Sequence, residues 1–286
     1  MAGGKFNRVI QRKEVLALSC GAMIGWSWVA LTGNWIEEAG TIGAIVAFLF
    51  GGTVVIFVGL TYAELASAMP QAGGEHVYSY RALGPTLSFV CTWAILLGYV
   101  SVVAFEAVAL PTVVDYLIPG FSKGYLWTVA NWEVNLTWVA VGVGGAVIIT
   151  TINILGIRTA ARLQMLATTM ILLVGLMLVS GGLVNGEPTN MEPLFDTGAK
   201  GLLGVVIMVP FMFVGFDVIP QSAEEIDVPF SEIGRLLMLS IVIAVFWYIA
   251  MIWSVSMGLP ESDRRASELP TADAMANLFS GAWAGK

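Results

Sequence analysis

The sequence predicts an all-α membrane protein whose helices cross the bilayer several times. Of the 286 residues, 57% are hydrophobic and 12% are charged, whereas charged residues make up about 25% of a soluble domain. Long apolar segments recur along the chain, and about 20 apolar residues in a helix cover the roughly 30 Å hydrocarbon core. The composition therefore excludes a soluble globular protein, and two of the segments carry helix-breaking residues at mid-depth.

Seven apolar segments are long enough to span the membrane, and they cover residues 15–36, 42–69, 87–118, 136–155, 163–184, 202–223 and 233–259. Lys and Arg favour cytoplasmic loops. With the N-terminus inside, eight basic residues lie in inner segments and two in outer ones up to the end of the seventh span. We therefore expect a multi-pass protein of the plasma (inner) membrane with a cytoplasmic N-terminus.

The first span is interrupted near its centre by glycine. The consecutive residues there are Gly21, Ala22, Met23, Ile24 and Gly25, and each glycine weakens a helix by roughly 1 kcal/mol relative to alanine. Backbone groups that lose their helical partners at this depth are tolerated where they line a cavity or meet a ligand. This stretch is therefore predicted to bind a transported solute.

The sixth span carries a second break. Pro210, Gly215, Asp217 and Pro220 lie within one short apolar stretch, and proline removes a donor and clashes with the carbonyl four residues earlier. We expect the helix to bend or unwind near Gly215. Asp217 then lies near the start of a new half-helix, where the positive dipole end favours a carboxylate.

Two interrupted spans at corresponding places indicate a midplane binding site in a transporter built from inverted repeats. Breaks in spans one and six imply a five-helix repeat. The predicted organisation is a cytoplasmic segment at 1–14, a first repeat at 15–184, two helices of a second repeat at 201–259, and an outer tail at 260–286. N–H groups after Met23 would hold a carboxylate, and carbonyls between Phe213 and Phe216 an ammonium.

The third span places a polar stripe on one helical face. Thr92, Tyr99 and Glu106 recur every seven residues, which drifts by only about 20° per step. Glu106 has no Lys or Arg within two turns, and a charge at such depth costs at least about 2.5–3.5 kcal/mol. Two interpretations stay open for Glu106: a proton or amine site, or a neutral hydrogen-bonded acid.

Three motifs together resemble those of the amino acid–polyamine–organocation (APC) permeases. Residues 21–25 are similar to the family's Gly-x-x-Ile-Gly signature. The second motif is Tyr62-Ala63-Glu64-Leu65 together with the Pro-x-Ala-Gly-Gly loop that follows it at 70–74. The third motif is Phe213-Val214-Gly215-Phe216-Asp217. The resemblance implies a five-plus-five inverted-repeat fold, with the substrate carboxylate at the first break and its amine at the sixth-span break.

The resemblance also implies roles for single residues. Phe211 resembles the aromatic gate position, and Asp217 resembles an acid that senses protons in some members. Some proton-coupled members carry a lysine in the fifth span, and that place here is near Met170 or Ile171. The family has at least ten core helices, so this chain is expected to be an N-terminal portion that needs further C-terminal helices.

The predicted function is a secondary transporter of an amino acid or related small amine that works by alternating access. The substrate-binding residues would be 21–25 together with Phe211, Phe213, Val214, Gly215 and Phe216, and the coupling residues Glu106 and Asp217. The expected partners are the substrate and the lipid bilayer, not nucleic acid. No cofactor is expected, with H⁺ or Na⁺ as the possible coupling ion, and an exchange-only or polyamine carrier is the alternative.

Other membrane proteins fit the sequence less well. A seven-helix receptor matches the span count, but such receptors place the N-terminus outside. A retinal protein needs a lysine within a helix, and all five lysines lie in loops or at span edges. An intramembrane enzyme needs a nucleophile–base pair or a metal cluster, which one histidine and the scattered Cys20 and Cys91 do not supply. A channel stays open, although nothing resembles a selectivity filter.

Overall fold

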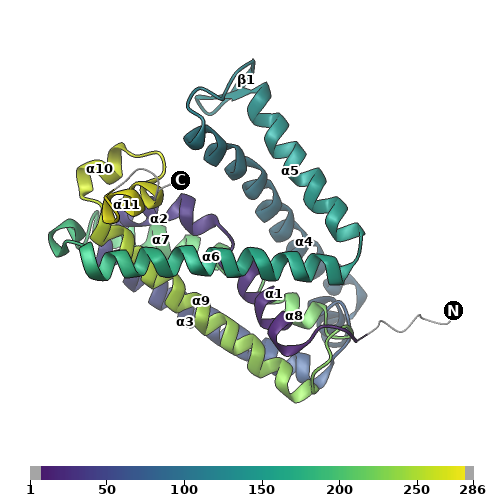
Figure 1. Cartoon of the computed structure of the whole chain (residues 1–286). Coiled ribbons are helices and arrows are strands. Elements are labelled where there is room, and N and C mark those ends of the chain that lie inside the picture. Colours follow the sequence, from purple (N-terminus) through teal and green to yellow (C-terminus); the bar gives the residue numbers. More distant parts are fainter. Residues whose placement is uncertain (1–7, 281–286) are drawn as a thin grey trace.

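The computed structural model describes residues 8–280, apart from the side chains at 157 and 158, and this part of the chain is helical except for one hairpin and the connecting turns (Figure 1). The elements in order are α1 (Arg12–Ile24), α2 (Ser27–Ala39), α3 (Thr41–Ala68), α4 (Glu75–Leu117), β1 (Tyr125–Val129), β2 (Trp132–Asn135), α5 (Leu136–Ile154), α6 (Ile157–Asn185), the 3₁₀ turn η1 (Pro188–Met191), α7 (Ala199–Met212), α8 (Val218–Gln221), α9 (Phe230–Gly258), α10 (Glu261–Ala266) and α11 (Pro270–Leu278).

All seven predicted spans coincide with helices. Within residues 8–280, five helices (α3, α4, α5, α6 and α9) are long and apolar enough to cross a membrane alone. The first predicted span is the pair α1 and α2, bent by 44° at its break. The sixth is the shorter apolar helix α7 followed by an irregular stretch and α8. The prediction of a polytopic all-α protein is confirmed.

The core lies around α9, against which α1, α2, α3, α6 and α11 all pack. Glycines on α3 allow backbones to approach closely, as small residues do in lipid, where helices gain little from the hydrophobic effect. A Cβ added at Gly51 would lie 2.6 Å from Val209, and one at Gly52 would lie 2.7 Å from Val245. Substituting these glycines would push α3 away from α7 and α9.

Helices α4 and α5 form a pair that leans away from the helices around α9 (Figure 1). α4 is kinked at Gly84, whose φ of +79° favours glycine. The kink separates a short N-terminal piece of α4, which carries Glu75, from the membrane-spanning part. Apolar side chains such as Phe89 and Trp93 are exposed along this part, as expected where a helix faces lipid.

Two segments predicted to lie outside the membrane-spanning helices have more structure than the sequence indicates. The loop between α4 and α5 folds into the hairpin of β1 and β2, and its turn residues Ala130 and Asn131 both have positive φ, as a two-residue type I′ turn requires. The segment predicted as an outer tail contains α10 and α11. The buried Arg264 of α10 donates hydrogen bonds to three backbone carbonyls, at Asn190, Leu259 and Glu192.

Candidate substrate and coupling site

The first break lies at Gly25 and Trp26, later than predicted. α1 continues to Ile24, and Gly25 has a φ of +31°. Gly21 belongs to the helix, and a Cβ there would collide with Gln164 and Thr168 of α6. The prediction that Gly21 interrupts the helix is therefore wrong, because its lack of a side chain serves close packing instead.

The second half-helix starts at Ser27 and offers unpaired donors. Within the described residues, the N–H groups of Trp26, Ser27 and Trp28 have no backbone carbonyl partner. The donors predicted directly after Met23 therefore lie three to five residues further along the chain. Unpaired N–H groups at a helix start can bind anions, so carboxylate binding at this break stays a prediction, now at these three residues.

The second break unwinds around Gly215, as predicted. α7 ends at Met212, α8 begins at Val218, and Gly215 has a φ of +113°. The carbonyls of Val214 and Phe216 accept no hydrogen bond from the described residues. For Phe216 the cause is Pro220, because the residue four positions later would be the helical donor and proline has no N–H.

The second break touches α1 one turn before the first break. A Cβ added at Gly215 would lie 2.6 Å from the Cβ of Ala22 and 3.0 Å from its carbonyl carbon. Real Cβ atoms essentially never come within 3.0 Å of another heavy atom, so the 2.6 Å contact with the Ala22 Cβ requires glycine. The unpaired donors after Gly25 and the unpaired acceptors around Gly215 therefore belong to one region of the molecule.

The other predicted substrate-binding residues divide by burial. Met23, Ile24 and Phe213 are buried in the core, and Phe213 packs against Tyr248 with ring centroids 5.6 Å apart. Phe211, Val214 and Phe216 are only half-buried. Phe211 meets Phe105 of α4 edge to face at 5.7 Å. Phe211 therefore lies between α4 and the second break, where an aromatic gate is expected.

Glu106 lies at the first break. The hydroxyl of Ser27 donates to Oε1 of Glu106 at 3.1 Å. That oxygen would be 3.7 Å from a Cβ at Gly25. A carboxylate at the N-terminal end of a helix is stabilised by the helix dipole, so Glu106 occupies the end of α2 at which a substrate carboxylate is expected to bind. The sequence does not indicate that Glu106 and a substrate carboxylate would compete for the same helix end.

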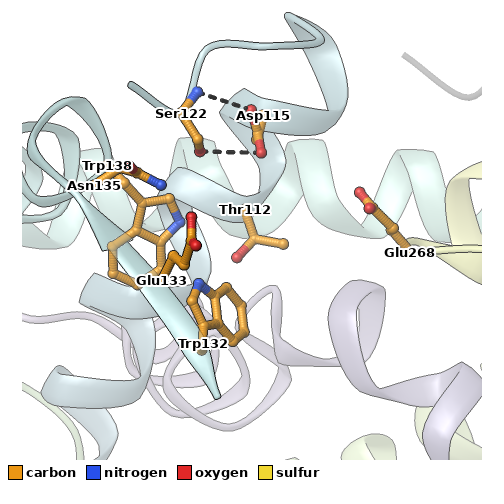
Figure 2. A pocket seen from close by; sticks show the side chains of 8 residues that line it. All are labelled: Thr112, Asp115, Ser122, Trp132, Glu133, Asn135, Trp138 and Glu268. Carbon is orange, nitrogen blue, oxygen red and sulfur yellow. Dashed lines mark hydrogen bonds between the residues drawn. The ribbon is translucent and has the colours of Figure 1, made fainter. Parts of the chain in front are cut away.

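A cavity of about 440 Å³ and another of about 430 Å³ are both lined by residues of α4 and α5. The smaller one adjoins the first break and is lined by Trp26, Glu106 and mostly apolar or small residues of α4 and α5. The larger one lies at the outer end of α4, and its lining includes Asp115, Trp132 and Glu268 (Figure 2). None of the predicted site residues lines the larger cavity, so we place the candidate site at the breaks.

Asp217 belongs to a buried polar cluster where the second break meets α8. The hydroxyl of Tyr99 donates to Oδ2 of Asp217 at 2.5 Å, and the Gln221 amide reaches the same oxygen at 2.9 Å. The Gln221 amide also lies 3.3 Å from Oε2 of Glu75. Glu75 and Asp217 are each 8% exposed. The cluster joins the N-terminal piece of α4 to α8.

This cluster contains two carboxyl groups and no basic partner among the described residues. The ion pairs among the described residues lie outside this cluster. They join Arg12 to Glu232, and Arg265 to Glu37, Asp196 and Glu261. Oε1 of Glu75 is buried without a hydrogen-bond partner. Burying an unpaired carboxylate is costly, so hydrogen bonds or a bound proton must balance the charge.

Sequence reasoning found part of this geometry. The stripe of Thr92, Tyr99 and Glu106 was predicted to share one face of α4. Tyr99 and Glu106 point at the breaks. Thr92 does not, because its hydroxyl bonds to His76 and to the Ser88 carbonyl. Glu75 and Gln221 were missed. The four-residue spacing of Asp217 and Gln221 was a readable signal, because side chains at this spacing share one face of a helix. Glu75 follows the Gly73–Gly74 turn and carried no such signal.

Comparisons with known proteins agree with this architecture. The family model described as "Amino acid permease" matches residues 14–281. The chain is similar to the branched-chain amino acid permease BcaP of Bacillus subtilis, with 26% identity over 83% of this chain and 52% of that protein. It is also similar to the aspartate-proton symporter of the same organism, with 23% identity over 86% of this chain and 47% of that protein.

A third relative, the methylthioribose transporter of Bacillus subtilis, is 24% identical over 85% of this chain and 54% of its own length. The chain thus spans about half the length of these curated relatives. The match to the family model covers nearly the whole chain. The broken helices, the apolar spans and this match lead to one conclusion: the chain belongs to the amino acid permease family, a family of multi-pass membrane transporters.

Proposed function

We propose that this chain forms the substrate-binding part of a secondary transporter for an amino acid or related small amine. The observation that carries the proposal is the contact between Gly215 in the second break and Ala22, three residues before Gly25 in the first break. It supports a shared site for unpaired N–H groups and unpaired carbonyls, the two kinds of group that bind a carboxylate and an ammonium. The printed names of the relatives, an amino acid permease and an aspartate-proton symporter among them, support the same class of substrate.

We assign the substrate groups to the two breaks. The N–H groups of Trp26, Ser27 and Trp28 bind the carboxylate, and the carbonyls of Val214 and Phe216 accept hydrogen bonds from the ammonium. Phe211 closes over the site from the second break. Alternating access then consists of movement of α1, α2, α7 and α8 around the bound substrate, within a five-plus-five fold that the rest of the carrier completes.

A proton is the coupling ion in this proposal. Glu106 holds the α2 end at which the substrate carboxylate binds, and two carboxylates at one helix end repel each other. Protonation of Glu106 removes this repulsion, so substrate and proton bind together. Asp217 acts on the inner side, where its bonds to Tyr99 and Gln221 hold the cytoplasmic path closed.

The test is uptake by proteoliposomes that hold the longest product of the reading frame containing this chain. Labelled amino acids and amines are screened with an inward proton gradient, a sodium gradient, or preloaded substrate. We expect saturable, proton-driven uptake of at least one amino acid. Uptake that needs preloaded substrate would indicate an exchanger and contradict the coupling proposal. The absence of any saturable uptake or exchange would contradict transport itself.

Replacing Asp217 with alanine removes the acceptor shared by Tyr99 and Gln221. Because the cluster lies beyond the break, on the inner side, the maximal rate of uptake should fall at least 10-fold while KM changes by less than about 3-fold. Asp227→Ala is the matched control, since Asp227 is an exposed acid on the same inner side. A large rise in KM for Asp217→Ala would show instead that Asp217 binds substrate directly.

A further inference from the structure

Tyr248 contacts both breaks from the middle of α9. Its hydroxyl lies 2.6 Å from the carbonyl oxygen of Met23 and 3.0 Å from that of Met212. The side chain is completely buried. Met23 and Met212 lie in the last turns of α1 and α7, so one hydroxyl bridges the ends of the two half-helices that precede the breaks.

These two carbonyls have lost their helical donors. In an unbroken helix the carbonyl of Met23 would accept from the N–H of Ser27, and that of Met212 from the N–H of Phe216. Ser27 makes no such bond, and Phe216 donates to Phe213 instead. Each carbonyl therefore belongs to the negative end of a helix. Leaving a buried carbonyl without a partner is unfavourable, and Tyr248 provides the partner for both.

The aromatic ring of Tyr248 holds the hydroxyl in place. The ring packs against Trp35, Phe48 and Phe213, with centroid separations of 5.7, 5.1 and 5.6 Å. These neighbours come from α2, α3 and the second break. A phenol carries a single proton for two acceptors, so the hydroxyl satisfies both carbonyls only while they stay at their present separation.

We propose that Tyr248 is a positioning residue for transport: its hydroxyl fixes the distance between the two breaks and so sets substrate affinity. The expected effect of Tyr248 on uptake rests on the proposed function. Its expected effect on the structure of the two breaks does not. Because the carbonyls of Met23 and Met212 already accept from Tyr248, they are not available to a substrate ammonium. The carbonyls of Val214 and Phe216 remain available to bind it.

Two substitutions at position 248 separate the hydroxyl from the ring. Tyr248→Phe keeps the ring and removes the donor. Tyr248→4-aminophenylalanine, introduced by amber suppression, keeps the ring and supplies two N–H donors, one for each carbonyl. Ser254→Ala is the control, because Ser254 lies on the same helix, is buried, and bonds only to its own helix at Ala250.

Uptake and hydrogen exchange are both measured. We expect Tyr248→Phe to raise KM at least 10-fold with kcat within about 3-fold, and the amine variant to restore KM to within about 3-fold of the wild type. Amides at 25–28 and 213–217 should exchange at least 10-fold faster in the Phe variant and recover in the amine variant. Ser254→Ala should change neither quantity.

Exchange at the breaks reports on Tyr248 even if the parent protein shows no uptake, so failure of the proposed function and failure of this inference are distinguishable. A Phe variant with wild-type exchange at both breaks would overturn the inference. Faster exchange that the amine variant does not reverse would also overturn it, because the ring rather than the donor would then be responsible.

Discussion

Replacing Gly215 with valine is expected to abolish saturable uptake, with a fall of at least 20-fold. A side chain at this position would overlap Ala22, since even its Cβ would lie 2.6 Å from the Ala22 Cβ. A φ of +113° is also costly for any residue with a Cβ. The two breaks would separate, and the donors and acceptors assigned to substrate would no longer face one ligand.

Gly156→Val is the matched control for this substitution. Gly156 has a similar φ of +121°, but a Cβ there would meet nothing within 4 Å. The Gly156→Val variant therefore introduces a similar backbone strain but disturbs no contact between α1 and the second break. Expression and detergent stability are measured for both variants. If Gly215→Val transports as well as Gly156→Val, the contact between the breaks has no part in transport.

Glu106→Gln is expected to remove the pH dependence of uptake. Protonated Glu106 leaves the end of α2 free for a substrate carboxylate, so wild-type uptake should fall at least 10-fold from acidic to alkaline pH. Glutamine is neutral at every pH and still accepts the bond from Ser27. The variant should therefore bind substrate at alkaline pH as well as at acidic pH, but lose accumulation driven by a proton gradient.

The control for Glu106 is Asp115→Asn, which neutralises another acid on α4. Asp115 lies near the outer end of the helix, where it accepts hydrogen bonds from Ser122. This variant should keep the wild-type pH profile. A loss confined to cationic substrates in Glu106→Gln, with an unchanged pH profile for neutral ones, would mean that Glu106 binds an amine and does not carry the coupled proton.

The spans were predictable because lipid imposes a simple rule. Backbone groups within the hydrocarbon must pair internally, so a sufficiently long apolar segment such as 42–69 is helical whatever it packs against. The break near Gly215 was predictable for a similar reason, because Pro220 removes a donor. Local chemistry decides both features.

The residues missed from the sequence depend on tertiary contacts. Gly21 and Gly25 are the same residue type in the same span, and only the approach of Gln164 and Thr168 makes Gly21 a packing residue. Tyr248 lies in an apolar helix among other aromatic residues, so its contact with the Met23 carbonyl has no sequence signal. The contact follows only once α1 and α9 are packed together.

The most direct test of the central claim, that the two breaks form the substrate site, is protection of a cysteine at Ala22 by substrate. Ala22 is exposed and adjoins Gly215. The variant Ala22→Cys, with Cys20 and Cys91 replaced by alanine, is treated with a water-soluble thiol reagent with and without transported amino acid. Ser262→Cys, exposed on α10, is the control.

Substrate should slow labelling at position 22 at least 5-fold, with half-maximal protection at a concentration close to KM, and leave position 262 unaffected. Equal labelling of position 22 with and without saturating substrate, in a variant that still transports, would contradict the placement of the substrate between the breaks.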